Sequence, residues 1–86
     1  MAELITAVKN ALLRRQEVER LTGLGRSAIY ARLDPNHSQY DPSFPRPVPL
    51  GSKGSTGSTH AVRWVSGEVD AWIKARIAER DNRKAA

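Results

Sequence analysis

Residues 15–33 read RQEVERLT, then GLG, then RSAIYARL, and this stretch decides the fold. Apolar side chains lie three residues apart in the first eight-residue part and four apart in the last, which is the spacing of one helical face. The glycines on either side of Leu24 favour a tight turn, with the Leu24 side chain packed between the two helices. The stretch therefore predicts a helix-turn-helix whose two short helices need tertiary packing to be stable.

The residues that follow predict a two-stranded wing. All five prolines lie between positions 35 and 49, which excludes a helix and a central strand there and leaves an edge strand over residues 44–50. Residues 51–60 (GSKGSTGSTH) have the composition of a flexible loop. Residues 61–65 (AVRWV) are typical of a strand, so the two extended segments are expected to form a hairpin.

A final helix is expected to begin at Ser66, which is a good N-cap. Glu68 and Asp70 fall in its first turn, where the helix dipole favours acidic side chains. Its apolar residues follow the period of one buried face. The predicted core of the whole domain comprises Val18, Leu21, Leu24, Ile29, Leu33, Val48, Leu50, Trp64, Val69, Trp72, Ile73 and Ile77.

The chain of 86 residues is long enough for one small domain, expected over residues 14–80. Residues 1–13 are interpreted as an N-terminal extension, and their apolar residues follow the pattern of a short amphipathic helix. The polar residues 81–86 are expected to fray as a tail. The predicted fold class is mainly α with a small β-hairpin, a winged helix-turn-helix.

Charge is the strongest global signal. Fourteen Lys and Arg residues oppose nine Asp and Glu, a net charge of +5, and ten of the fourteen are arginine. Such a balance points first to nucleic acid and second to an anionic membrane surface. The absence of cysteine excludes disulfides and thiolate sites, and no apolar run is long enough to span a membrane. Residues 1–13 lack the continuous apolar core of a signal peptide, so an intracellular protein is expected.

The sequence contains no pattern typical of an enzyme or a cofactor site. The glycine-rich loop lacks the Gly-Lys-Ser/Thr spacing of a phosphate-binding loop, and no helix directly follows it. His37 and His60 lie on separate loops without cysteine partners, which makes a metal site a poor interpretation. We therefore predict no catalytic residue, no metal and no cofactor.

The second helix of the helix-turn-helix is the candidate recognition helix. With Ile29 taken as the centre of its buried face, Ser27 and Ala31 lie opposite, on a face of small residues that can closely approach a DNA groove. The predicted DNA-contact residues are Arg26, Ser27, Ala28, Tyr30, Ala31 and Arg32 on this helix, Arg14 and Arg15 near a phosphate at the start of the preceding helix, and Ser52, Lys53, Ser55 and Arg63 in the wing.

Three blocks, residues 15–30, 40–48 and 64–73, resemble the AlpA family of phage-associated regulators. The resemblance covers roughly residues 12–80 and implies a fold like that of MerR-type winged-helix proteins and phage excisionases. It also implies a DNA-binding transcriptional regulator, often of prophage genes such as an integrase, with DNA contacts at Arg26, Ser27 and Tyr30. Two departures are Gly25, where the family usually has serine, and a longer wing loop.

These observations predict a sequence-specific regulator that binds double-stranded DNA and serves a prophage or integrative element. The expected location is the bacterial cytoplasm, at the nucleoid. Two alternatives stay open: an excisionase that bends attachment-site DNA, and a protein-interaction adaptor that binds no DNA. Expected partners besides DNA are a second copy on DNA or a recombinase, with no membrane and no small-molecule substrate. The sequence contains no heptad run, so no dimer zipper is predicted.

Overall fold

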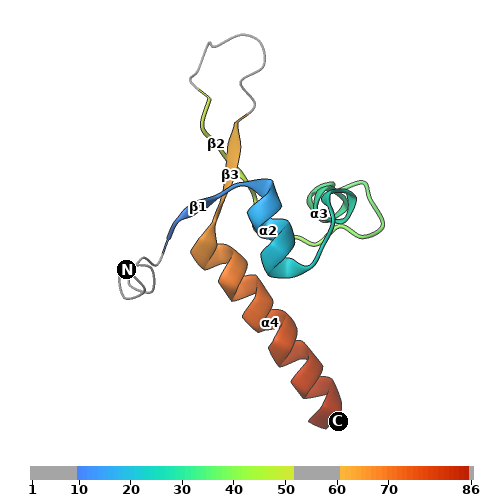
Figure 1. Ribbon diagram of the computed structural model, residues 1–86. Coiled ribbons are helices and arrows are strands. Elements are labelled where there is room, and N and C mark those ends of the chain that lie inside the picture. The colour runs from blue at the N-terminus through green and yellow to red at the C-terminus, as the bar shows by residue number, and fades with distance from the viewer. Residues whose placement is uncertain (1–9, 52–60, 86) are drawn as a thin grey trace, which may run out of the picture.

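The computed structural model describes residues 10–51 and 61–85. Figure 1 shows a short helix beside the long C-terminal helix and another short helix on its far side, with the hairpin at one end of the molecule and the C-terminus at the other. This arrangement confirms the predicted class, mainly α with a small β-hairpin in a winged helix-turn-helix. The elements are β1 (Leu12–Leu13), α2 (Arg15–Thr22), α3 (Arg26–Leu33), β2 (Val48–Pro49), β3 (Val62–Val65) and α4 (Ser66–Ala85).

The turn between α2 and α3 uses its two glycines differently. Gly23 ends α2 with a φ of 76°, a left-handed conformation that favours glycine, and its N–H donates to the Glu19 carbonyl at 2.8 Å. Gly25 is extended, and its carbonyl accepts the first hydrogen bond of α3, from the Ile29 N–H at 3.0 Å. The helix-turn-helix predicted from residues 15–33 is thus confirmed.

The described strands form an antiparallel sheet in the order β1-β3-β2. Val48 of β2 pairs with Arg63, which confirms the predicted hairpin, and Leu12 of β1 pairs with Val65 on the other edge of β3. The helical interpretation of residues 1–13 is therefore wrong at residues 12 and 13. These two residues form a strand because pairing with the edge of β3 satisfies their backbone hydrogen-bonding groups. An amphipathic pattern in the sequence cannot show that this edge lies close to them. Residues 1–9 lie outside the described residues.

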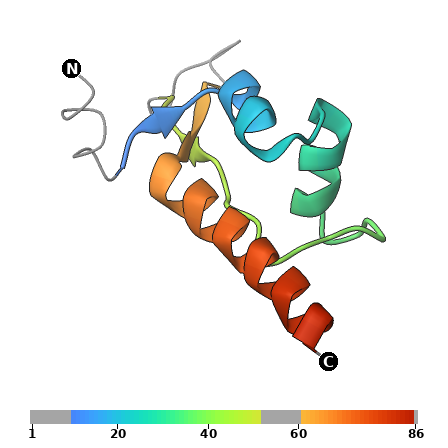
Figure 2. The same ribbon diagram turned by 60° about the horizontal axis from the view of Figure 1, so that its bottom comes forward.

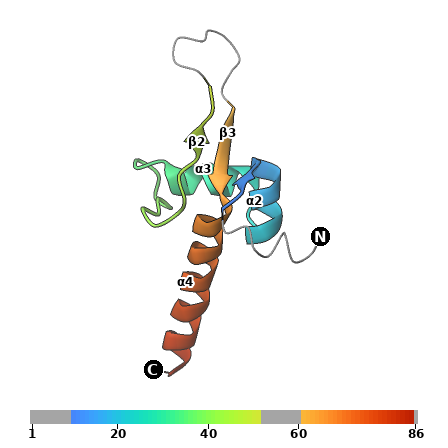
Figure 3. The same cartoon turned by 90° about the vertical axis from the view of Figure 1, so that its left-hand side faces the viewer.

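The long helix α4 continues directly from β3 (Figure 3). Its start at Ser66 agrees with the prediction, and Ser66 also joins β1 to the helix: its N–H donates to the Ala11 carbonyl at 2.8 Å, and its Oγ accepts from the Ala11 N–H at 2.7 Å. Helix α4 runs on through residues 81–85, which were expected to form a frayed tail. Ion pairs one turn apart support its exposed surface, such as Lys74–Asp70 at 2.9 Å.

The core is smaller than predicted. Val18, Ile29, Trp64 and Val69 are buried as expected, and Leu24, Leu33, Trp72 and Ile73 are half-buried against them. The placement of Leu21, Val48, Leu50 and Ile77 in the core is wrong, because these side chains remain 37–55% exposed. Phe44, at 2% exposure, is a core residue that was not predicted. It lies among prolines without helical or strand periodicity, so pattern analysis gave no signal for its burial.

The two tryptophans hold the proline-rich segment against the rest of the fold. In Figure 2 this segment crosses from the end of α3 to α4 before it reaches the sheet. The Trp64 Nε1 donates to the Pro45 carbonyl at 3.1 Å, and the Trp72 ring meets the Phe44 ring edge-to-face, with centroids 5.0 Å apart. Both indole rings therefore fix the path of a segment that has little regular structure.

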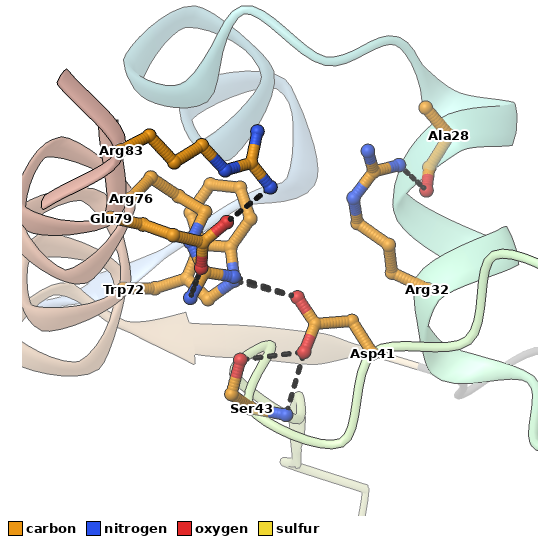
Figure 4. A network of polar contacts seen from close by, with 8 residues as sticks. All are labelled: Ala28, Arg32, Asp41, Ser43, Trp72, Arg76, Glu79 and Arg83. Carbon is orange, nitrogen blue, oxygen red and sulfur yellow. Dashed lines mark hydrogen bonds and ion pairs between the residues drawn. The ribbon is translucent and has the colours of Figure 1, made fainter. Parts of the chain in front are cut away.

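Asp41 is the polar centre of this attachment (Figure 4). Its Oδ2 accepts hydrogen bonds from Trp72 Nε1 at 3.0 Å and from Arg76 Nη1 at 3.2 Å. Its Oδ1 accepts from the N–H of Ser43 at 2.9 Å and from the Ser43 hydroxyl at 2.5 Å. The Asp41 N–H donates to the Arg32 carbonyl at 2.9 Å. Through its backbone and its carboxylate, Asp41 therefore joins the end of α3 to α4. We call Asp41, Ser43, Trp72 and Arg76 the Asp41 anchor.

The pKa of the Asp41 carboxyl lies below its ordinary value of 3.8. Burial is the largest single influence and raises this pKa, but the hydrogen bonds from Ser43 and Trp72 and the charge of Arg76 together outweigh it. The anchor therefore holds Asp41 as an ionised carboxylate whose oxygens are occupied by donors.

Candidate nucleic-acid interface

The exposed face of α3 carries Arg26, Ser27 and Tyr30. All three were predicted as DNA-contact residues, and the structure places them on the same side of the helix, with Tyr30 42% exposed. The Arg26 guanidinium lies over the Tyr30 ring, 6.0 Å from its centroid, near the outer limit of a cation–π contact. We call these three residues the α3 face.

The expected centre of this face was wrong at Ala31. Ala31 is buried, with 9% exposure, and Ala28 is half-buried, so the face is centred on Arg26 and Tyr30 instead of on Ser27 and Ala31. The prediction took Ile29 as the only buried centre. The helix is covered on more than one side, since α2 contacts it and the segment after it bonds to the Arg32 carbonyl.

Arg32, another predicted DNA-contact residue, bonds within its own helix. Its Nη1 donates to the Ala28 carbonyl one turn earlier at 3.0 Å, and the side chain is half-buried. It lines a hollow of about 340 Å³ together with Tyr40 and Phe44, in the proline-rich segment. The Arg32 side chain therefore lies toward the proline-rich segment and is not part of the α3 face.

Four of the predicted contact residues, which come from three separate parts of the sequence, line one hollow of about 360 Å³. Arg14 and Arg15 come from the start of α2, Tyr30 from α3 and Arg63 from β3. The Arg63 Nη1 donates to the Val62 carbonyl at 2.8 Å, which restrains this side chain beside the strand. We call this site the arginine hollow. It joins the helix-turn-helix to the wing, whereas the sequence analysis assigned Arg63 to the wing alone.

Glu19 positions one of these arginines. Its Oε2 accepts from the Arg15 Nε at 2.8 Å, and both side chains are partly buried. The pKa of the Arg15 guanidinium is raised: the hydrogen bond to Glu19 is the largest influence, burial opposes it by less, and a hydrogen bond with Tyr30 raises the pKa by a smaller amount still. The sequence analysis missed Glu19, although its place four residues after Arg15 on a helix is a recognisable ion-pair spacing.

Ser52, Lys53 and Ser55, the other predicted wing contacts, lie outside the described residues. The same is true of the predicted flexible loop from residue 52 to residue 60. Their assignment to DNA contact therefore stays a prediction.

Comparison with known proteins bears directly on these predictions. Residues 11–77 match the family described as "Prophage CP4-57 regulatory protein (AlpA)". The chain belongs to the AlpA family. It is 35% identical over 65 residues to the "DNA-binding transcriptional activator AlpA" of Escherichia coli K12, an alignment that covers 76% of this chain and 83% of that protein.

A second relative comes from a phage. The chain is 40% identical over 68 residues to "Uncharacterized protein ORF88" of Enterobacteria phage P4, across 79% of this chain and 62% of that protein. No solved structure matches this chain. The AlpA match begins one residue before β1 and ends within α4, so it includes the α3 face, the arginine hollow and the Asp41 anchor.

Two further observations concern other kinds of site. Within residues 10–51 and 61–85, no group of three or more His, Asp or Glu side chains is arranged to hold a metal ion. None of the helices in the described part of the chain is long and apolar enough to cross a membrane.

Proposed function

We propose that this AlpA family member is a sequence-specific regulator that binds double-stranded DNA through the α3 face and the arginine hollow. The observation that carries the proposal is the convergence of exposed Arg26, Ser27 and Tyr30 with the arginines of the neighbouring hollow. Family membership supports the same conclusion, since the E. coli relative is named a DNA-binding transcriptional activator.

Each element has a distinct part in the proposed complex. Helix α3 enters the major groove, where Arg26 donates to guanine or phosphate and Ser27 and Tyr30 provide hydroxyl groups. The arginines of the hollow bind the phosphate backbone beside α3. The wing loop, including Lys53, meets the adjacent minor groove or backbone. The protein needs no catalytic group for this work, and we propose that it acts at the nucleoid, in the cytoplasm.

The proposed target is a promoter of a prophage or integrative element. Immunoprecipitation of the protein with its bound DNA, followed by sequencing, tests this. A single site next to a promoter supports a regulator. Tandem sites beside an attachment core support the alternative of an excisionase that acts with a recombinase or with further copies of itself.

Salt dependence tests whether duplex DNA is the ligand at all. If about five cationic side chains neutralise phosphates, the slope of log K against log salt is expected near −4 to −5. Titration of a labelled duplex from the identified site, at several salt concentrations, measures it. A slope weaker than about −1 contradicts binding through the phosphate backbone and favours the protein-interaction adaptor.

A further inference from the structure

We infer that the arginine hollow is a seat for a single backbone phosphate of the duplex, shared by the helix-turn-helix and the wing strand. The inference rests on the proposed function and adds a specific ligand, a phosphodiester, at a specific place. Arg14 and Arg63 lie 49 positions apart in the sequence. They line one hollow because β1, which ends directly before Arg14, pairs with β3, which contains Arg63.

The charge of the hollow fits an oxyanion. Three arginines line it, and no Asp or Glu of the described residues does. The nearby Glu19 binds Arg15 through Nε, so that ion pair does not use the two terminal nitrogens of the guanidinium. A planar guanidinium with two such donors matches phosphate geometry in the bidentate mode.

The other groups of the hollow also favour phosphate. Tyr30 lines it with a hydroxyl-bearing ring, and tyrosine hydroxyls are common donors to phosphate oxygens. The hollow is open and measures about 360 Å³, enough for a phosphate group with bridging water. The Arg63 side chain is already restrained by its bond to the Val62 carbonyl, which reduces the entropy that binding would cost.

The position of the hollow gives the phosphate a particular consequence. Tyr30 belongs both to the hollow and to the α3 face, where Arg26 lies over its ring. Contacts to phosphates fix the register of a protein on the duplex, while contacts to bases specify the sequence. A phosphate bound in the hollow therefore fixes the position of α3 and β3 along the DNA groove.

The first test uses the free full-length protein and inorganic phosphate, followed by backbone amide chemical shifts. We expect saturable shifts confined to residues 14–16, 30 and 61–64, and their loss in Arg63→Gln. Arg46→Gln is the matched control, because Arg46 is exposed and lines a different hollow. Equal shifts in wild type and Arg63→Gln, or shifts spread evenly over all arginines, overturn the inference.

The second test uses duplex DNA. Arg63→Gln is expected to weaken binding about fivefold to tenfold at 0.1 M salt, equally for specific and unrelated sequences, and to make the salt slope weaker by about one. If Arg63→Gln does not fold, Arg14→Gln replaces it, since Arg14 is exposed. Wild-type affinity and slope in a folded variant overturn the phosphate seat and leave DNA binding by the α3 face standing. Failure of the wild-type protein to bind any duplex overturns both.

Discussion

The α3 face and the Asp41 anchor both gather polar side chains, but the two regions use them differently. In the anchor, both oxygens of Asp41 are occupied by donors from its own chain, and Trp72 and Arg76 reach it from α4. On the α3 face, Arg26 and Ser27 are exposed, and Arg26 lies over the ring of Tyr30 on the same face. Polar groups that satisfy each other stabilise a fold, whereas exposed groups on a rigid helix remain available to a ligand. The anchor is thus the support, and the α3 face is the part that binds.

The sharpest way to break the support is Trp64→Ala. Trp64 is fully buried and bonds to Pro45, so its loss is expected to lower the free energy of unfolding by about 3–5 kcal/mol. This loss is comparable to the whole stability of a small domain. Urea unfolding followed by circular dichroism measures it. A loss under about 1 kcal/mol would show that the proline-rich segment does not depend on this ring.

The anchor itself is tested by Asp41→Asn, because an amide has no charge and keeps only one acceptor oxygen, so its NH2 must face either the Trp72 and Arg76 donors or the Ser43 N–H. We expect a loss of about 1–3 kcal/mol in the free energy of unfolding at neutral pH. The folded pKa of Asp41 is lowered, so its contribution is present above the unfolded pKa of 3.8 and is lost as pH falls through the folded value.

The difference between wild type and Asp41→Asn should therefore shrink in acid. Urea unfolding at a series of pH values from neutral to below 3.8 measures this. Asp34→Asn is the matched control, because Asp34 is an exposed aspartate in the turn after α3. A difference that stays constant down to the lowest pH would contradict an ionised, stabilising Asp41.

Two arginines of α3 are expected to affect different properties of the protein: Arg26 its affinity for DNA and Arg32 its stability. Arg26→Ala is expected to weaken specific DNA binding by about 1–3 kcal/mol and to leave the free energy of unfolding within about 0.5 kcal/mol of wild type. Arg32→Ala is expected to do the reverse, because it loses the bond to the Ala28 carbonyl, with a stability cost of about 0.5–1.5 kcal/mol. DNA titration and urea unfolding of both variants give four numbers, and the opposite pattern would contradict the orientation of α3.

The sequence predicted the elements well, since each depends on local signals. The apolar spacing in residues 15–33, the glycines between the helices and Ser66 gave the helix-turn-helix and the start of α4. Features that depend on distant segments were missed. Phe44 has no periodic neighbours, β1 needed the edge of β3, and Asp41 needed donors from residues 72 and 76.

The candidate site shows the same division. Arg26, Ser27 and Tyr30 were predicted as DNA contacts because the AlpA resemblance points to all three, and the helical wheel also places Ser27 opposite the buried Ile29. Ala31 was placed wrongly because a wheel centred on one buried residue cannot show that a helix is covered on two sides. The meeting of Arg63 with Arg14 depends on strand pairing and could not be seen from spacing.

The smallest expected effect concerns the two glycines before α3. Gly25 has an extended backbone, and a Cβ at this position would meet no atom within 4 Å. Serine would add a side-chain cap to the N-terminus of α3 and reduce the entropy of the unfolded chain, so Gly25→Ser is expected to raise the free energy of unfolding by about 0.5–1 kcal/mol. Gly23→Ser is the matched control. It has the same open surroundings but a φ of 76°, so it should lower stability by about 1–2 kcal/mol. Thermal unfolding of the two variants beside wild type measures both signs, and equal changes would show that the backbone at Gly23 is not held in the left-handed conformation that ends α2.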